Sequence, residues 1–194
     1  DLDNLIRLLY ENLDLFASEL ADMPGSDVML HRIDTGDSPP IRRRSYRHSP
    51  AHRAEISRQV EEMERAGIVE PSDSPWCSPV ILVTKRSDKS KRFVVDYRSL
   101  NAKTVLSAYP LPLFEEIVDT ISVQKPVLWS SLDLKSGFWQ LGLDPETKDR
   151  TGFQTDKGQY VFNRLSMGLS GAVNFFQNVM QRVLRGLVPS VSIV

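Results

Sequence analysis

Residues 127–143 decide the expected fold, and they read Val127-Leu128-Trp129-Ser130-Ser131-Leu132-Asp133-Leu134-Lys135-Ser136-Gly137-Phe138-Trp139-Gln140-Leu141-Gly142-Leu143. Apolar and small polar residues alternate in the first half, which predicts a half-buried strand ending at Asp133. A carboxylate between Leu132 and Leu134 loses hydration when such a strand is buried, so it needs a basic side chain or a hard metal ion beside it. The competing interpretation is that Asp133 caps a short helix beginning at Ser136.

Several other motifs surround this stretch. Before it come Lys91-Arg92-Phe93-Val94-Val95-Asp96-Tyr97-Arg98-Ser99-Leu100-Asn101 and Tyr109-Pro110-Leu111-Pro112. After it come Thr151-Gly152-Phe153-Gln154-Thr155, Tyr160-Val161-Phe162 and Met167-Gly168-Leu169-Ser170-Gly171-Ala172. With these motifs in this order and at these separations, residues 31–194 resemble the reverse transcriptase (RNA-directed DNA polymerase) of gypsy-type LTR retrotransposon Pol polyproteins. The resemblance stops just before the Tyr-X-Asp-Asp motif of that family.

Length and composition are those of an ordinary soluble globular protein. The 194 residues are 41% hydrophobic and 25% charged, and they are enough to bury a core. No apolar run is long enough to cross a bilayer, and no basic segment followed by an apolar one begins the chain, so neither a membrane nor secretion is expected. Cys77 is the single cysteine, which excludes an internal disulfide and a cysteine zinc site.

The net charge of −1 hides a segregated distribution. Residues 1–30 hold seven acids and one arginine, whereas residues 41–58 hold six arginines and one acid. Residues 85–92 hold five cations and one acid. Such local basic clusters suit a polyanionic partner better than the net charge suggests, although a solvated surface explains Arg42 to Arg44 equally well.

Hydrophobic periodicity predicts both helices and strands. Helices are expected at residues 3–20, 49–67, 114–121 and 172–187. Ser49 and Pro50 supply an N-cap and a first-turn proline for the second of these helices, and Gly67 is its expected C-cap. Besides the central strand, strands are expected at residues 28–33, 80–84, 92–96, 150–155, 159–163 and 191–194.

Two of these strands form a hairpin with a basic tip. Lys85 ends the first strand and Arg92 begins the second, so both side chains are expected on the same side near the turn. A triphosphate needs spread positive charge and a forked donor, and arginine supplies the bidentate contact that lysine cannot. The alternative is an exposed basic tip without a ligand.

The resemblance implies an α+β fold with reverse-transcriptase-like fingers and a partial palm, whose ferredoxin-like sheet is backed by helices. Five regions are expected. They are an N-terminal tether with an amphipathic helix and a strand (residues 1–45), the fingers (46–126), the first part of the palm (127–143), a returning fingers hairpin (144–171) and the second, truncated part of the palm (172–194).

The resemblance also implies the roles of site residues. Asp133 is the expected catalytic carboxylate, and it would bind metal together with the backbone carbonyl of Leu134. The expected nucleotide-binding residues are Lys85, Arg92, Ser136, Gly137, Phe138, Met167 and Gly168. Asp96, Arg98 and Asn101 are the expected template–primer contacts, with Asp96 and Arg98 paired. The ring of Phe138 would exclude a 2′-hydroxyl, unless it is an ordinary core residue.

Two Mg²⁺ ions are expected in the complete enzyme, because nucleotidyl transfer uses two divalent ions held by carboxylates. In the family the other carboxylates belong to the Tyr-X-Asp-Asp turn, so this fragment alone is predicted to be inactive. The expected partners are an RNA or DNA template with its primer, deoxynucleoside triphosphates, and the thumb, ribonuclease H and integrase regions of the Pol polyprotein. The expected location is the cytoplasm, in a virus-like particle, or the nucleus.

A decayed, catalytically dead remnant that binds nucleic acid at most is the main alternative. Met167 stands where the family usually has Phe, and Val173 and Asn174 replace the usual Pro and Ala. Loss of that proline loosens the expected helix start.

An aspartic protease is a further alternative, because Asp34-Thr35-Gly36 is the active-site triplet of that class. A protease needs a buried apolar strand before the triplet and a β-rich domain after it. Here His31-Arg32 precedes it and Ser38-Pro39-Pro40 follows, so we reject this interpretation.

Overall fold

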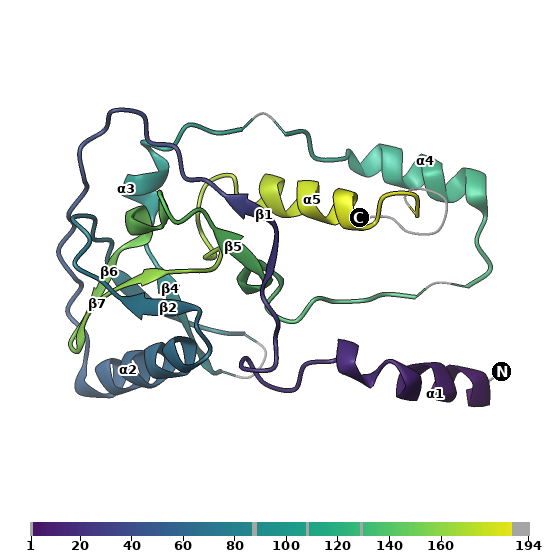
Figure 1. Ribbon diagram of the computed structural model, residues 1–194, viewed down its shortest axis with the longest axis horizontal. Coiled ribbons are helices and arrows are strands. Elements are labelled where there is room, and N and C mark those ends of the chain that lie inside the picture. Colours follow the sequence, from purple (N-terminus) through teal and green to yellow (C-terminus); the bar gives the residue numbers. More distant parts are fainter. Residues whose placement is uncertain (1, 87–88, 108, 129, 188–194) are drawn as a thin grey trace.

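The computed structural model describes residues 2–86, 89–107, 109–128 and 130–187 (Figure 1). Its helices are α1 (Leu2–Glu11), α2 (Pro50–Arg65), α3 (Arg98–Asn101), α4 (Phe114–Gln124) and α5 (Ala172–Val183). Its strands are β1 (Ser26–His31), β2 (Val69–Pro71), β3 (Val80–Thr84), β4 (Lys91–Val95), β5 (Leu141–Leu143), β6 (Phe153–Thr155) and β7 (Gly158–Phe162). Short 3-10 helices occur at η1 (Leu13–Leu15), η2 (Gly137–Gln140) and η3 (Lys148–Thr151).

The described strands form three small sheets. β1 pairs with β5 in parallel, β2, β7 and β6 form an antiparallel sheet, and β3 and β4 form an antiparallel hairpin. Phe153 of β6 is fully buried where its sheet meets the β3–β4 hairpin, with its ring 5.3 Å from Phe93, 5.8 Å from Tyr160 and 5.3 Å from Phe162. Both hairpins expected from the sequence are therefore confirmed, and the expected strand at residues 191–194 lies outside the described residues.

Helix α2 begins and ends as its sequence predicts. The Ser49 hydroxyl accepts a hydrogen bond of 3.2 Å from the His52 backbone N–H, and Pro50 is in the first turn. Gly67, just beyond the helix, has the positive φ of 67° that glycine adopts without steric cost. The helix turns one face toward the core, and the residues spaced along that face are buried, namely Ile56, Val60 and Met63.

The N-terminal region joins the rest of the protein through β1 and the residues after it. His31 pairs with Leu143 of β5, and the backbone N–H of Ile33 donates to the Thr147 hydroxyl at 3.2 Å. The Arg150 guanidinium donates to the Ile33 carbonyl. The expected amphipathic helix is divided into α1 and η1, and α1 buries none of its residues.

The strand predicted at residues 127–133 is wrong for the residues that the structure describes. These residues form no regular element, and Val127, Leu128 and Leu132 are 94%, 88% and 90% exposed. A strand needs a neighbour to take its backbone hydrogen bonds, and no described strand runs beside this segment. Among the residues expected to form the palm, the described part therefore contains one strand, β5. The implied ferredoxin-like sheet does not form there.

Helices α1 and α4 lie at one end of the molecule, away from the three sheets (Figure 1). Helix α4 buries none of its residues, whereas α5 buries Ala172 and Val179 against the core. The first turn of α5 forms without the family's proline, with the Phe175 N–H donating to the Gly171 carbonyl at 2.9 Å, and Asn174 donates to the Tyr109 carbonyl at 2.7 Å. No helix in the described ranges is long and apolar enough to span a membrane.

Candidate functional site

The β3–β4 hairpin positions the two predicted phosphate ligands. Val83 pairs with Arg92, and the Lys85 N–H continues the ladder by donating to the Ser90 carbonyl at 2.9 Å. Because side chains alternate along a strand, Lys85 lies on the same face as Val83 and therefore as Arg92. Phe93 is buried on the other face. The two cations thus share the face of the hairpin that points away from the core, as the sequence predicts.

Asp96 and Arg98 form the expected ion pair just after β4. Arg98 Nη2 lies 2.6 Å from Asp96 Oδ2, and Arg98 Nε donates to Oδ1 at 2.8 Å. The Tyr46 hydroxyl, missed by the sequence analysis, also donates to Oδ2 at 2.8 Å. Chiefly through the Arg98 hydrogen bonds, these donors hold the pKa of Asp96 well below its usual range. The Asp96 side chain is only 9% exposed while that of Arg98 is 83% exposed, so Arg98 is the member of the pair that meets solvent.

Asn101 joins the end of α3 to the loop containing Met167 and Gly168. Its side-chain nitrogen donates to the Gly168 carbonyl at 2.8 Å, and its side-chain oxygen accepts from the Ser170 N–H at 2.8 Å. Gly168 has a φ of 89°, and a Cβ there would lie 3.7 Å from the Val95 carbonyl oxygen. The structure therefore brings together residues that the sequence assigned to separate contacts, and both ends of the Asn101 amide are bonded within the protein.

A tight turn presents Ser136, Gly137 and Phe138. Ser136 is left-handed with a φ of 48°, and the Gly137 N–H donates to the Leu134 carbonyl at 3.2 Å. Phe138 is half-buried, with its ring 5.2 Å from that of Phe176 in α5. A Cβ on Gly137 would lie 3.1 Å from the Phe176 ring, so the turn is tightly packed on α5.

Asp133 is exposed in the segment before this turn, so the expected loss of hydration does not occur. It does not cap η2 either, because Ser136 occupies the N-cap position. Within the described ranges, no hydrogen bond or ion pair joins Asp133 to Lys85, to Arg92 or to any other residue. Nor do three or more His, Cys, Asp or Glu side chains gather there into a metal-binding group. Asp133 and the Leu134 carbonyl are thus two oxygen donors that form no hydrogen bond or ion pair with Lys85 or Arg92 among the described residues.

A family model described as reverse transcriptase (RNA-dependent DNA polymerase) matches residues 83–193, which is more than half of the chain. The chain belongs to the reverse transcriptase family. Its curated relatives are long polyproteins. It is 38% identical over 191 residues to the retrovirus-related Pol polyprotein from transposon 412 of Drosophila melanogaster, covering 96% of this chain and 15% of that protein. It is 32% identical over 175 residues to the one from transposon gypsy of the same species, covering 88% and 17%.

Solved reverse transcriptase structures share the fold. The native prototype foamy virus protease–reverse transcriptase matches with a TM-score of 0.81 and 26% identity, over 96% of this chain and 25% of that one. The foamy viral protease–reverse transcriptase in complex with an RNA/DNA hybrid matches with a TM-score of 0.80 and 20% identity, over 98% and 25%. The predicted α+β class and the gypsy-type family are therefore confirmed, and the chain spans a small part of the length of its relatives.

Proposed function

We propose that this chain is the part of a retrotransposon reverse transcriptase that grips the incoming nucleotide and holds the template beside it. One observation carries the proposal, namely the register that places Lys85 and Arg92 on one solvent-facing side of the β3–β4 hairpin. Arg92 is exposed and Lys85 is half-buried, so both amine and guanidinium remain available to a ligand. Two cations of this kind offset part of the negative charge of a triphosphate through charge-assisted hydrogen bonds.

Each cation has a distinct role in this proposal. The Arg92 guanidinium binds two phosphate oxygens as a fork and so orients the phosphate chain, whereas the Lys85 ammonium neutralises charge without fixing a direction. The free N–H of a left-handed turn residue also binds phosphate, and Ser136 is in that conformation. Gly137 is a weaker candidate, because its N–H already donates to the Leu134 carbonyl.

The remaining predicted residues surround the nucleotide and its template. Phe138 would lie beneath the sugar, where its ring excludes a 2′-hydroxyl and so favours deoxynucleotides. Met167 and Gly168 would lie against the new base pair, with the Asn101 bonds holding their loop in place. Arg98 would contact the template backbone, since its side chain is exposed while Asp96 orients it.

Asp133 and the Leu134 carbonyl are the proposed Mg²⁺ ligands of this chain. When bound, two such ions would activate the primer hydroxyl and neutralise the triphosphate. One carboxylate and one carbonyl fall short of the oxygen set that Mg²⁺ requires, so the described residues do not fit a two-ion centre by themselves. We therefore propose that this fragment alone does not catalyse nucleotide addition, and that other carboxylates of the Pol polyprotein complete the site.

The partners in this proposal are an RNA or DNA template with its primer, deoxynucleoside triphosphates, and the thumb, ribonuclease H and integrase regions of the same polyprotein. The foamy virus relatives solved with an RNA/DNA hybrid and with double-stranded DNA support a nucleic-acid partner for this fold. The proposed location is a cytoplasmic virus-like particle or the nucleus, because these are the places where the enzyme would meet the nucleic acid that it copies.

Binding of a fluorescent deoxynucleoside triphosphate to this chain, preloaded with a primer–template, tests the proposal. Lys85→Ala/Arg92→Ala should weaken triphosphate binding by tenfold or more, since it removes two charge-assisted contacts of about 1.5 kcal/mol each. The matched control is Lys91→Ala, which removes a cation from the opposite face of the same hairpin, where Lys91 bonds Thr84. Equal losses in the two variants would show that only nonspecific charge is involved and would refute the proposal.

A further inference from the structure

An exposed stretch before α2, outside every helix and strand, reads Arg42-Arg43-Arg44-Ser45. Basophilic protein kinases select a serine or threonine by the arginines that precede it, and they hold those arginines with carboxylates of their own cleft. The positions that such kinases read are the second and third before the hydroxyl, which here are Arg43 and Arg42. The sequence before Ser45 therefore has the charge pattern of a kinase substrate.

Exposure distinguishes Ser45 from the other described hydroxyl residues that have a cation three positions earlier. Thr35 follows Arg32 at that spacing, but it is only 3% exposed. Thr151 follows Lys148, but it is 0% exposed, and its hydroxyl donates to the Lys148 carbonyl at 2.6 Å. Ser45 is exposed, and within the described ranges neither its hydroxyl nor its backbone forms a hydrogen bond. Of these three residues, a kinase can therefore reach Ser45 alone.

Ser45 also lines a hollow that is rich in arginine. The hollow has a volume of about 980 Å³, and the titratable residues that line it are Arg44, Tyr46, Arg47, His48, Arg53 and Asp156. Arg53 lies 3.3 Å from the Asp156 carboxylate, so these two charges are paired. Within the part of the chain that the structure describes, no hydrogen bond or ion pair engages the guanidinium of Arg44 or Arg47. A phosphate on Ser45 would therefore meet two arginines whose charge is not already paired.

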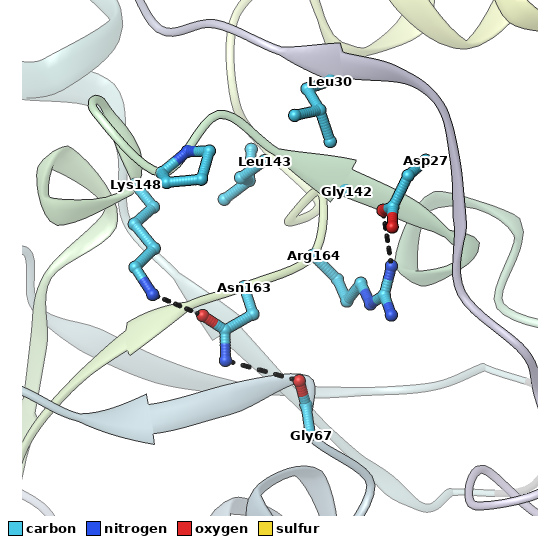
Figure 2. A pocket seen from close by; sticks show the side chains of 9 residues that line it. Asp27, Leu30, Gly67, Gly142, Leu143, Lys148, Asn163 and Arg164 are labelled. Carbon is cyan, nitrogen blue, oxygen red and sulfur yellow. Dashed lines mark hydrogen bonds and ion pairs between the residues drawn. The ribbon is translucent and has the colours of Figure 1, made fainter.

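Another hollow, of about 440 Å³, shows the opposite arrangement (Figure 2). There Lys148 Nζ lies 2.6 Å from Glu70 Oε1 and 2.8 Å from Asn163 Oδ1. Arg164 lies 3.5 Å from Asp27. Both cations are therefore paired within the protein, whereas the hollow beside Ser45 keeps two arginines free among the described residues.

We propose that Ser45 is a phosphorylation site for a basophilic protein kinase, and that Arg44 and Arg47 then bind the phosphoryl group. In the reaction the Ser45 Oγ forms a bond to the γ-phosphorus of ATP, the bond from that phosphorus to the oxygen of the leaving ADP breaks, and the hydroxyl proton passes to the catalytic carboxylate of the kinase. The phosphate has a charge of about −1.5 to −2 at pH 7 and three acceptor oxygens, which guanidinium groups bind through charge-assisted hydrogen bonds. This proposal does not depend on the function proposed above.

Incubation of the purified chain with ATP, Mg²⁺ and the catalytic subunit of cyclic-AMP-dependent protein kinase, a basophilic enzyme, tests the modification. Mass spectrometry should find a phosphoryl group on Ser45. In Arg42→Ala/Arg43→Ala, kcat/KM of the kinase should fall about tenfold or more, because two charged contacts with the kinase are lost. The matched control is Arg65→Ala, which removes an exposed arginine from the far end of α2 and should leave kcat/KM unchanged. Absence of phosphate from Ser45, or equal kcat/KM for the double variant and the unaltered chain, would overturn the proposed site.

Phosphorus NMR of the phosphorylated chain, recorded as a function of pH, tests the binding of the phosphate by the two free arginines. The second ionisation of a phosphoserine has an ordinary pKa of about 6, and nearby guanidinium groups favour the dianion, so the pKa of the Ser45 phosphate should lie below that value. In Arg44→Ala/Arg47→Ala, which keeps both arginines that the kinase reads, the pKa should return to its ordinary value, whereas Arg65→Ala should keep it lowered. The same pKa in the double variant and the unaltered chain would overturn the role of Arg44 and Arg47.

Discussion

The carboxamide of Asn101 connects segments that are 67 positions apart in the sequence, which is why the sequence analysis assigned it only to the template. An asparagine after Arg98-Ser99-Leu100 carries no local signal of its distant partner. Lys85 and Arg92, in contrast, were predicted on one face because strand alternation and a short turn are local properties. Among site residues, those governed by local geometry could be predicted, and those governed by tertiary contact could not.

Replacing Asn101 with Ala should lower the free energy of unfolding by about 1–2 kcal/mol, because the Gly168 carbonyl and the Ser170 N–H both lose a 2.8 Å partner. Urea denaturation followed by circular dichroism measures the change. Lys103→Ala, an exposed substitution two residues away, is the control and should leave the midpoint unchanged. An unaltered midpoint in Asn101→Ala would mean that the amide does not hold the loop.

His31 should make stability depend on pH. Its side chain is buried, its Nε2 atom has no partner among the described residues, and its ring lies 4.8 Å from that of Phe175. Burial lowers the pKa of His31 to about 4 from an ordinary value of 6.5. Between these two values the unfolded chain binds a proton that the folded chain does not, so stability falls as the pH falls.

The expected loss from this histidine between pH 7 and pH 5 is about 2 kcal/mol, and it should be absent in His31→Phe, which keeps an aromatic ring against Phe175. Urea unfolding of both proteins at the two pH values isolates the contribution, since all other titrating groups are common to them. The same pH dependence in both proteins would show that His31 becomes protonated in the folded state at little cost.

At the scale of elements, α2 and the two hairpins could be predicted because the residues that mark their ends and turns lie within or directly beside them in the sequence. Ser49, Pro50 and Gly67 mark the helix ends, and the polar turns mark the hairpins. The stretch at residues 127–133 has the alternation of a strand but not the neighbour that a strand needs. Alternation reports which residues could share a face, whereas strand formation also depends on a partner for the backbone.

The backbone amides of residues 130–134 should accordingly exchange with solvent rapidly. They lie outside every described element, and Leu132 is 90% exposed. Hydrogen exchange followed by mass spectrometry should show little protection there and strong protection in β4, which is paired along its length with β3. Equal protection in the two segments would mean that residues 130–134 are paired in solution, as the sequence pattern suggested.

At the scale of the whole molecule, the chain combines a well-packed region around Phe153 with an end whose apolar surface is uncovered. Helices α1 and α4 bury no residue, and both lie at that end, α4 toward the top of Figure 1 and α1 toward the bottom. The cationic residues proposed to meet nucleotide and template belong to the packed region, and the single candidate metal carboxylate, Asp133, lies in an exposed segment outside every helix and strand. We therefore expect this chain to bind its substrates without catalysing nucleotide addition.

Electrophoresis of a labelled primer on an RNA template, incubated with this chain, Mg²⁺ and deoxynucleoside triphosphates, tests that separation most directly. A native gel reports the protein–nucleic acid complex, and a denaturing gel of the same reaction reports primer length. The predicted result is a stable complex with no extended primer. Mg²⁺-dependent extension that disappears in Asp133→Asn, or the absence of any complex, would contradict the account.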